Sequence, residues 1–213
     1  MRYQGIIFDL DGVICSTDEY HYQAWKALAD RLGIPFDRER NNLLRGVSRM
    51  KSLEIILEKA PRPYTDEEKA ALAEEKNERY RRLLCNMTPA DLSEDVRRTL
   101  NALREKGLLL AIGSSSKNTP FILSRIGLSG FFDAVADGNC ITRSKPDPEV
   151  FLTAASMLHL SPADCLVVED AHAGVQAAAS GGFACAAIGD AKEDPLATYH
   201  LQAFPELLNA VRQ

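Results

Sequence analysis

Two aspartates stand one residue apart near the start of the chain, directly after a short hydrophobic run. Residues 6–8 are Ile-Ile-Phe, and they lead into Asp9, Asp11 and Gly12. Such a run is typical of a central strand in a parallel sheet, and open α/β sheets bind ligands at the carboxyl ends of their strands. Carboxylates there can act as nucleophile and general acid/base, or bind a hard cation such as Mg²⁺. A strand end with two solvated aspartates is the alternative.

Polar groups also follow three further predicted strands. They are Ser114 and Ser116 after residues 108–112, Lys145 after residues 132–136, and Glu169 with Asp170 after residues 166–168. Because parallel strands bring their carboxyl ends to one edge of the sheet, these groups can meet Asp9 and Asp11. The carboxylates alone would repel a phosphate. A divalent cation and the Lys145 ammonium would balance them and stabilise a transferring phosphoryl group.

The elements that position these groups form two parts. Residues 17–84 have helical patterns without a convincing strand, including a capping box at Thr65 that opens a helix toward Leu84. From residue 93 onward, helices alternate with short hydrophobic strands, the last at 183–188, and Asp147-Pro148 predicts the start of a helix over 149–158. We predict an α/β fold with a Rossmann-like parallel sheet core and helices on both faces. Residues 1–14 and 92–213 form the catalytic core, and residues 15–91 form an inserted all-helical cap domain.

Composition argues against several classes of protein, including nucleic-acid-binding, membrane-spanning and disulfide-rich proteins. The 213 residues carry a net charge of −5, which argues against nucleic acid or anionic membranes as partners. No apolar stretch approaches the ~20 residues needed to cross a bilayer, and no signal-peptide pattern is present, so we expect a cytoplasmic protein. The five cysteines are widely spaced without a CxxC pair, which indicates neither disulfides nor zinc. Cys15 is an alternative nucleophile, but no Cys-His pattern supports it.

The order of the motifs resembles the haloacid dehalogenase superfamily of phosphotransferases. The resemblance is carried by Asp9-Leu10-Asp11-Gly12-Val13, Ser114, Lys145-Pro146 and Glu169-Asp170. It implies that Asp9 attacks phosphorus and becomes an aspartyl phosphate, and that Asp11 is the general acid/base. It also implies that Mg²⁺ is held by Asp9, the backbone carbonyl of Asp11 and Asp170, with Glu169 close by. Ser114 and Lys145 would contact the phosphoryl group.

The inserted segment is similar to the caps of sugar-phosphate mutases in this superfamily. The matching segments are Glu19-Tyr20-His21, Ala24-Trp25-Lys26, Arg45-Gly46-Val47-Ser48-Arg49 and Lys76-Asn77, together with Ser116-Lys117-Asn118 in the core. The resemblance implies that Arg49, Ser116, Lys117 and Asn118 hold the phosphate that is not reacting. His21 would contact Asp11, with Lys76 as its neighbour. Gly46, Val47, Ser48 and Trp25 would line the substrate site.

These cap residues also have purely structural explanations. His21 and Trp25 share one helix face with Leu28 and could be core residues, and Arg49 could be a solvated surface charge. Lys76 lies in a charged run that a solvent-exposed helix face would explain. Arg45 departs from the superfamily pattern, where a lysine is common.

The resemblance implies a Mg²⁺-dependent enzyme that interconverts β-glucose 1-phosphate and glucose 6-phosphate through an aspartyl-phosphate enzyme and a hexose bisphosphate. A sugar-phosphate phosphatase with the same nucleophile is the nearest alternative, and a non-catalytic phosphosugar-binding protein is another. A dehalogenase is disfavoured because halide departure does not need the acid that Asp11 supplies. We expect a monomer whose partner is a small phosphosugar, with no nucleic acid or membrane partner.

Overall fold

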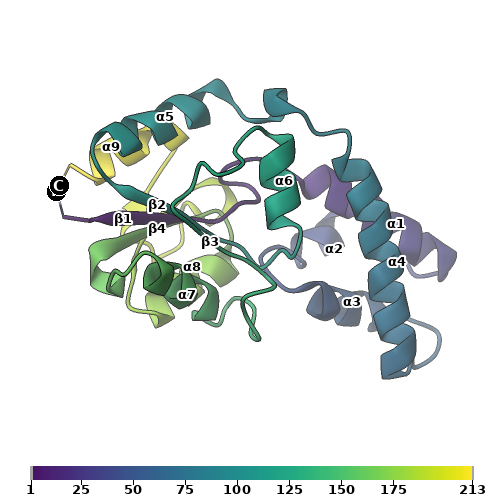
Figure 1. The fold of residues 1–213 in the computed structure, drawn as a ribbon. Coiled ribbons are helices and arrows are strands. Elements are labelled where there is room, and N and C mark those ends of the chain that lie inside the picture. Colours follow the sequence, from purple (N-terminus) through teal and green to yellow (C-terminus); the bar gives the residue numbers. More distant parts are fainter. Residues whose placement is uncertain (1, 213) are drawn as a thin grey trace.

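The computed structural model describes residues 2–212 and shows a parallel sheet covered by helices, with a group of helices at one side (Figure 1). Within these residues the strands are β1 (Gly5–Phe8), β2 (Leu109–Gly113), β3 (Ala134–Ala136), β4 (Cys165–Glu169), β5 (Ala184–Ala187) and β6 (Tyr199–His200). Their order is β3-β2-β1-β4-β5-β6, and every neighbouring pair is parallel. The predicted α/β fold class is confirmed.

The helices divide between the sheet and a separate group. They are α1 (Asp18–Arg31), α2 (Arg38–Asn42), α3 (Arg49–Leu57), α4 (Asp66–Leu84), α5 (Glu94–Glu105), α6 (Thr119–Arg125), α7 (Glu149–Met157), α8 (His172–Ser180) and α9 (Leu207–Ala210), with short 3₁₀ helices at Pro89–Asp91, Pro162–Asp164, Gly189–Ala191 and Phe204–Glu206. We call α1 to α4 and the loops between them the cap, and the rest of the chain the core.

Both faces of the sheet are buried, as the continuous hydrophobic strands require. Successive side chains of a strand point to opposite faces. Ile6 and Phe8 therefore pack against α5 and α9, whereas Ile7 packs against α7 and α8, and all three are fully buried. Burial on both faces leaves only the ends of the strands accessible to a ligand.

The cap has a hydrophobic cluster of its own. Trp25 and Leu28 of α1 pack with Leu53 of α3 and Leu72 of α4. Helix α4 begins with the predicted capping box, in which the Thr65 hydroxyl accepts a hydrogen bond from the backbone of Glu68 and the Glu68 carboxylate accepts one from the backbone of Thr65. The cap therefore packs as a unit beside the sheet.

Two local features differ from the sequence prediction. Strand β6 was not predicted, because two residues are too short for an alternating pattern to be recognised. Strand β5 is shorter than the predicted 183–188. Helix α7 begins at Glu149, as predicted, and the Asp147 carboxylate accepts a hydrogen bond from the Glu149 backbone at 3.0 Å. No helix in the described part of the chain has the length and hydrophobicity to span a membrane.

Candidate active site

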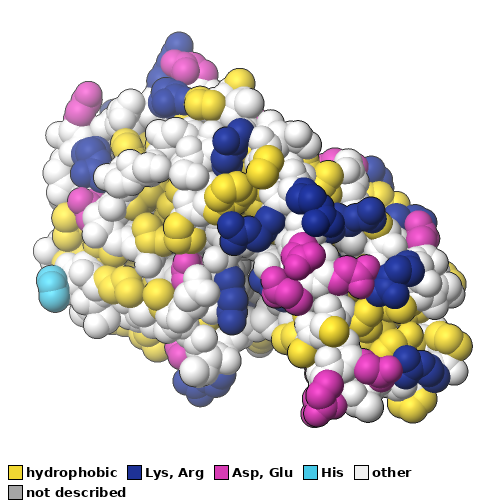
Figure 2. All heavy atoms as spheres, turned by 45° about the vertical axis from the view of Figure 1, so that its right-hand side comes forward, with side chains coloured by type: hydrophobic (Ala, Val, Ile, Leu, Met, Phe, Trp, Pro, Cys, Tyr) yellow, Lys and Arg dark blue, Asp and Glu magenta, His cyan; other side chains and the backbone are white. Residues whose placement is uncertain are grey.

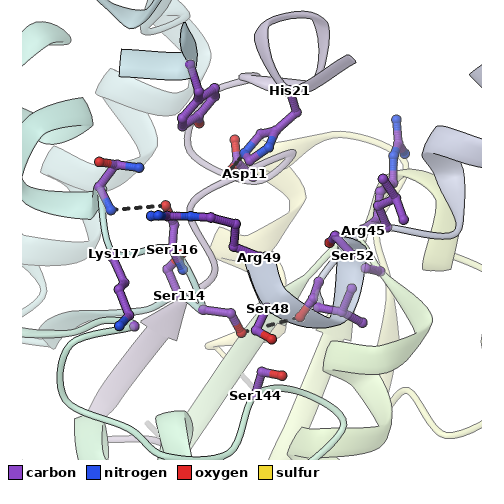
Figure 3. A pocket seen from close by; sticks show the side chains of 18 of the residues that line it. Asp11, His21, Arg45, Ser48, Arg49, Ser52, Ser114, Ser116, Lys117 and Ser144 are labelled. Atoms are coloured by element: carbon purple, nitrogen blue, oxygen red, sulfur yellow. Dashed lines mark hydrogen bonds and ion pairs between the residues drawn. The ribbon is translucent and has the colours of Figure 1, made fainter. Parts of the chain in front are cut away.

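A cavity of about 790 Å³ lies where the carboxyl ends of β1, β2 and β4 meet the cap (Figure 3). Its wall includes nearly every residue that the sequence predicted for the site: Asp9, Asp11, His21, Trp25, Gly46, Val47, Ser48, Arg49, Lys76, Ser114, Ser116, Lys117, Asn118, Glu169 and Asp170. Lys145 is the exception. It lies behind the wall, where it contacts Asp9.

The turn after β1 lets Asp9 and Asp170 lie side by side at the ends of their strands. The Asp9 backbone N–H donates to the carbonyl of Val168, which continues the pairing of β1 with β4. Gly12 follows with a φ of +82°, a conformation that favours glycine. A Cβ atom at this position would lie 2.0 Å from Oδ2 of Asp170. Glycine is therefore needed both for the turn and for the approach of the Asp170 carboxylate.

Lys145 joins two buried carboxylates. Its Nζ atom lies 2.5 Å from Oδ1 of Asp9 and 2.5 Å from Oε1 of Glu169. Burial alone would lower the pKa of Lys145, but attraction to Asp9 and Glu169 outweighs burial and raises it. Glu169 also accepts hydrogen bonds from the backbone N–H groups of Asp170 and Ala171. Both oxygens of Glu169 are thus engaged, which favours positioning of Lys145 over direct contact with a metal.

The negative charge that Lys145 leaves unbalanced at the site is suited to a hard cation. Burial, together with neighbouring carboxylates, raises the pKa of Asp9 to about 7 and that of Asp170 to about 8. One Lys145 ammonium cannot neutralise Asp9, Glu169 and Asp170 together. Among residues 2–212 no three acidic, His or Cys side chains form a complete ligand set. Mg²⁺ commonly takes one or two protein carboxylates and completes its shell with phosphate and water oxygens. Asp9 and Asp170 fit that pattern.

Asp11 is held by a residue that sequence reasoning missed. Oδ1 of Asp11 accepts hydrogen bonds from the backbone N–H of Thr17, at 3.1 Å, and from the Thr17 hydroxyl. Oδ2 lies 3.9 Å from Nε2 of His21. Burial raises the pKa of Asp11, against the effect of the Thr17 hydrogen bonds, and this favours a carboxyl group that can carry a proton. Thr17 precedes α1 and would be taken for a helix cap, yet its hydroxyl makes no capping bond.

Lys76 is buried, so the solvent-exposed explanation of this residue is wrong. Only 3% of Lys76 is exposed, and its Nζ atom lies 2.9 Å from Nδ1 of His21. Burial and the neighbouring Arg49 guanidinium lower the pKa of Lys76 well below its usual value. Burial and the Lys76 charge likewise lower the pKa of His21. The ammonium also lies 4.6 Å from the centre of the Trp25 ring, so Trp25 contacts the site while it packs in the cap.

A second group of donors lines the cavity beside these residues. Arg49 extends from the start of α3 into the cavity, and the loop that carries Ser116 and Lys117 faces it (Figure 3). Glu74 lies 3.3 Å from the Arg49 guanidinium, but burial outweighs this attraction and lowers the pKa of Arg49. A guanidinium, an ammonium and a hydroxyl together can bind a phosphate.

Three contacts join the cap to the core around the cavity. Arg45 of the cap forms an ion pair with Asp190 of the core. The Ser115 hydroxyl donates to the carbonyl of Gly46 at 3.3 Å. The Asn118 side-chain amide of the core donates to the Asn77 side chain of α4 at 3.0 Å. The structure therefore holds the cap against the core around the site.

The alternative nucleophile Cys15 is poorly suited to that role. Its side chain is buried, with 7% exposure of the residue. Burial and the negative charges of Asp11 and Asp9 raise the pKa of the Cys15 thiol. Because the thiolate is the reactive form of cysteine, these surroundings favour a packing role.

Comparison with known proteins shows which family this chain and its relatives share. Residues 3–182 match the model of the haloacid dehalogenase-like hydrolases. The chain is 45% identical over 188 residues to a β-phosphoglucomutase of Bacillus subtilis, which covers 87% of this chain and 83% of the relative. It is 32% identical over 182 residues to a fructose-1-phosphate phosphatase of Escherichia coli, with 85% and 94% coverage. A solved structure of β-phosphoglucomutase from Clostridium difficile matches with a TM-score of 0.93 and 35% identity, over 99% of this chain and 96% of that one.

Proposed function

The chain belongs to the haloacid dehalogenase-like hydrolase family, and from this premise we propose that it is a Mg²⁺-dependent phosphosugar mutase that interconverts β-D-glucose 1-phosphate and D-glucose 6-phosphate. The observation that carries the proposal is that one cavity is lined by two separate groups of side chains, each suited to a phosphate. Asp9, Asp11 and Ser114 form the first group, with Lys145 behind Asp9, and the Arg49 guanidinium with the 116–118 loop forms the second. A hexose bisphosphate needs both at once.

The two aspartates carry out the chemistry. Phosphorylated Asp9 gives its phosphoryl group to the free hydroxyl of the sugar phosphate while Asp11 takes the hydroxyl proton, which yields the bisphosphate and the free Asp9 carboxylate. The bisphosphate then turns around in the cavity. Asp9 attacks the other phosphorus, and Asp11 returns its proton to the oxygen that leaves. Lys145 orients Asp9, and Ser114 donates to a phosphoryl oxygen.

Mg²⁺ would be held by Asp9, Asp170 and the backbone carbonyl of Asp11, and it would neutralise negative charge on the transferring phosphoryl group. Two features support this assignment. Asp9 and Asp170 are carboxylates with raised pKa values, which a cation would return toward the ionised form. Gly12 leaves the space in which Asp170 approaches. Glu169 acts here through Lys145.

The cap favours transfer to sugar over loss to water. Gly46, Val47 and Ser48 contribute to the wall of the cavity and would contact the sugar. His21 of the cap lies 3.9 Å from Asp11 and Lys76 contacts His21, so this pair approaches the acid/base only when the cap lies against the core. Exclusion of water protects an aspartyl phosphate from hydrolysis.

A small phosphosugar is the partner in this proposal. We further propose a cytoplasmic monomer without nucleic acid or membrane partners, as the acidic composition indicates. On the face in Figure 2, basic and acidic side chains lie intermingled over the cap, which supports the same view.

Product analysis tests the proposal. The protein is supplied with β-glucose 1-phosphate, Mg²⁺ and a trace of glucose 1,6-bisphosphate, and glucose 6-phosphate and inorganic phosphate are followed together. We expect glucose 6-phosphate as the main product and no turnover by Asp9→Asn. Free glucose with stoichiometric inorganic phosphate would instead identify a phosphatase. Tight binding without any phosphoryl transfer would identify a binding protein.

A further inference from the structure

Tyr80 of α4 is buried beside the acid/base and has no place in the reaction described so far. It is 1% exposed, and its hydroxyl donates a hydrogen bond to Oγ1 of Thr17 at 2.9 Å. The Thr17 hydroxyl in turn donates to Oδ1 of Asp11. A chain of two hydrogen bonds therefore runs from a cap helix to the acid/base of the core.

The direction of these two hydrogen bonds follows from the single hydrogen that each hydroxyl can donate. A hydroxyl has one hydrogen to donate and can accept at its lone pairs. Because Tyr80 donates to Thr17, the Thr17 hydrogen is left to point at Asp11. Bonds that run in one direction polarise one another, so the first strengthens the second. Together with the Thr17 backbone N–H, this engages Oδ1 and leaves Oδ2 free on the side of His21.

The Tyr80 ring also contacts His21, which lies beside Asp11, and Lys76, which contacts His21. Its centre lies 4.1 Å from that of the His21 ring and 4.4 Å from Nζ of Lys76. Lys76 and Tyr80 are four residues apart on α4, so they share one helix face. A phenylalanine would keep these ring contacts. A buried hydroxyl is costly unless it is bonded, and within residues 2–212 the partner of this one is Thr17.

We infer that Tyr80 is a positioning residue which, through Thr17, orients the Asp11 carboxyl so that Oδ2 can exchange a proton with the sugar oxygen. The inference rests on the proposed function of Asp11 as general acid/base. In the step concerned, the bond between sugar oxygen and phosphorus breaks, Asp9 gains the phosphoryl group, and the proton of Asp11 passes to the sugar oxygen. When the leaving group of a phosphoryl donor needs no proton, the rate of phosphoryl transfer to Asp9 does not depend on the orientation of Asp11.

A comparison of two phosphoryl donors distinguishes positioning of Asp11 by Tyr80 from a packing role of Tyr80. Phosphoenzyme formation is measured by rapid quench with Mg²⁺ and either glucose 1,6-bisphosphate, whose leaving group is an alcohol, or acetyl phosphate, whose leaving group is a carboxylate. We expect Tyr80→Phe to slow transfer from the bisphosphate by about tenfold, part of what general acid catalysis provides, with unchanged bisphosphate affinity. Transfer from acetyl phosphate should stay within about twofold of wild type.

Variants of both hydroxyls complete the test. Thr17→Val should be slower than Tyr80→Phe, Thr17→Ser should restore much of the rate, and the double variant should be no slower than Thr17→Val, because the two bonds act in series. Tyr3→Phe is the matched control, since the buried Tyr3 hydroxyl is bonded to that of Tyr199 and neither residue lines the cavity. It should leave both rates unchanged.

The outcomes are distinct. Equal slowing with both donors, or an unchanged bisphosphate rate in Tyr80→Phe, would overturn the inference. If wild type forms the phosphoenzyme but passes it only to water, the mutase assignment fails while the donor comparison still holds. If wild type forms no phosphoenzyme, both the proposed function and this inference are overturned.

Discussion

Arg45 of the cap is ion-paired with Asp190 of the core at the rim of the cavity. Its other terminal nitrogen lies 2.9 Å from Oδ2 of Asp18, at the start of α1. The Arg45 side chain is 31% exposed and that of Asp190 is 65% exposed, so the pair stabilises the closed arrangement by about 1 kcal/mol or less. A contact of this strength can favour closure and still break when substrate enters or product leaves.

Loss of this ion pair should loosen the cap. We expect Asp190→Asn to raise KM for the sugar phosphate by up to about fivefold, and to increase the share of phosphoryl groups lost to water. The measurement is the ratio of inorganic phosphate to glucose 6-phosphate at several salt concentrations. Asp30→Asn, which breaks an exposed ion pair with Lys26 within α1, is the control and should change neither value. An unchanged ratio in Asp190→Asn would show that Arg45 does not secure the cap.

Removal of Lys145 should cost stability as well as activity. In Lys145→Met, Asp9 and Glu169 remain buried without their shared cation, and breaking such a pair costs about 3–5 kcal/mol. Urea unfolding should show this loss. The double variant Lys145→Met with Glu169→Gln should regain part of the stability but no turnover, since the Asp9 contact is still missing. Wild-type stability in the single variant would contradict this view of the pair.

Mg²⁺ should stabilise the folded protein without any substrate. A ligand at one hundred times its Kd adds about 2.7 kcal/mol to the free energy of unfolding, and relief of repulsion between Asp9 and Asp170 supplies the reason here. We expect Mg²⁺ to raise Tm in wild type and in the control Asp190→Asn. Asp170→Asn should lose most of this shift. Removal of Mg²⁺ with a chelator should abolish turnover reversibly, and an equal Tm shift in Asp170→Asn would place the cation elsewhere.

His21 should make stability depend on pH below neutrality. Burial and the Lys76 charge lower the pKa of His21 in the folded protein well below its usual 6.5. As pH falls through about 6.5, His21 becomes protonated in the unfolded chain but stays neutral in the folded protein. The contribution of His21 to the free energy of unfolding is therefore complete above this pH and decreases as pH falls toward the folded pKa. The slope from one proton is at most about 1.4 kcal/mol per pH unit.

The check compares two histidine variants. Stability is measured by urea unfolding between about pH 5 and 7. His21→Asn should flatten the curve relative to wild type, whereas His159→Asn, which changes an exposed histidine on the core, should not. Equal slopes in wild type and His21→Asn would mean that His21 does not remain neutral in the folded protein.

Much of the fold could be predicted because local patterns determine it. Hydrophobic residues 6–8 and 166–168 lie in strands of one parallel sheet, as expected, and Thr65 opens α4 through the predicted capping box. Strand β6 escaped prediction because its two residues form a strand only by pairing with β5. Asp9, Asp11, Ser114, Glu169 and Asp170 line one cavity because parallel strands end at one edge of the sheet. Thr17 and Tyr80 were missed, because a hydroxyl before a helix and an aromatic on a helix face have ordinary structural explanations.

The order of the chemical groups along the chain can be read without a structure: two carboxylates after β1, then a lysine, and a second carboxylate pair at the end of β4. Spacing along the chain is a local property, so it is visible without a structure. The contacts between these groups, by contrast, depend on how the chain folds. Glu169 pairs with Lys145, Lys76 is buried against His21, and Tyr80 reaches Thr17, 63 residues away. Burial and long-range contacts set the charge and orientation of these side chains, and neither can be read from spacing.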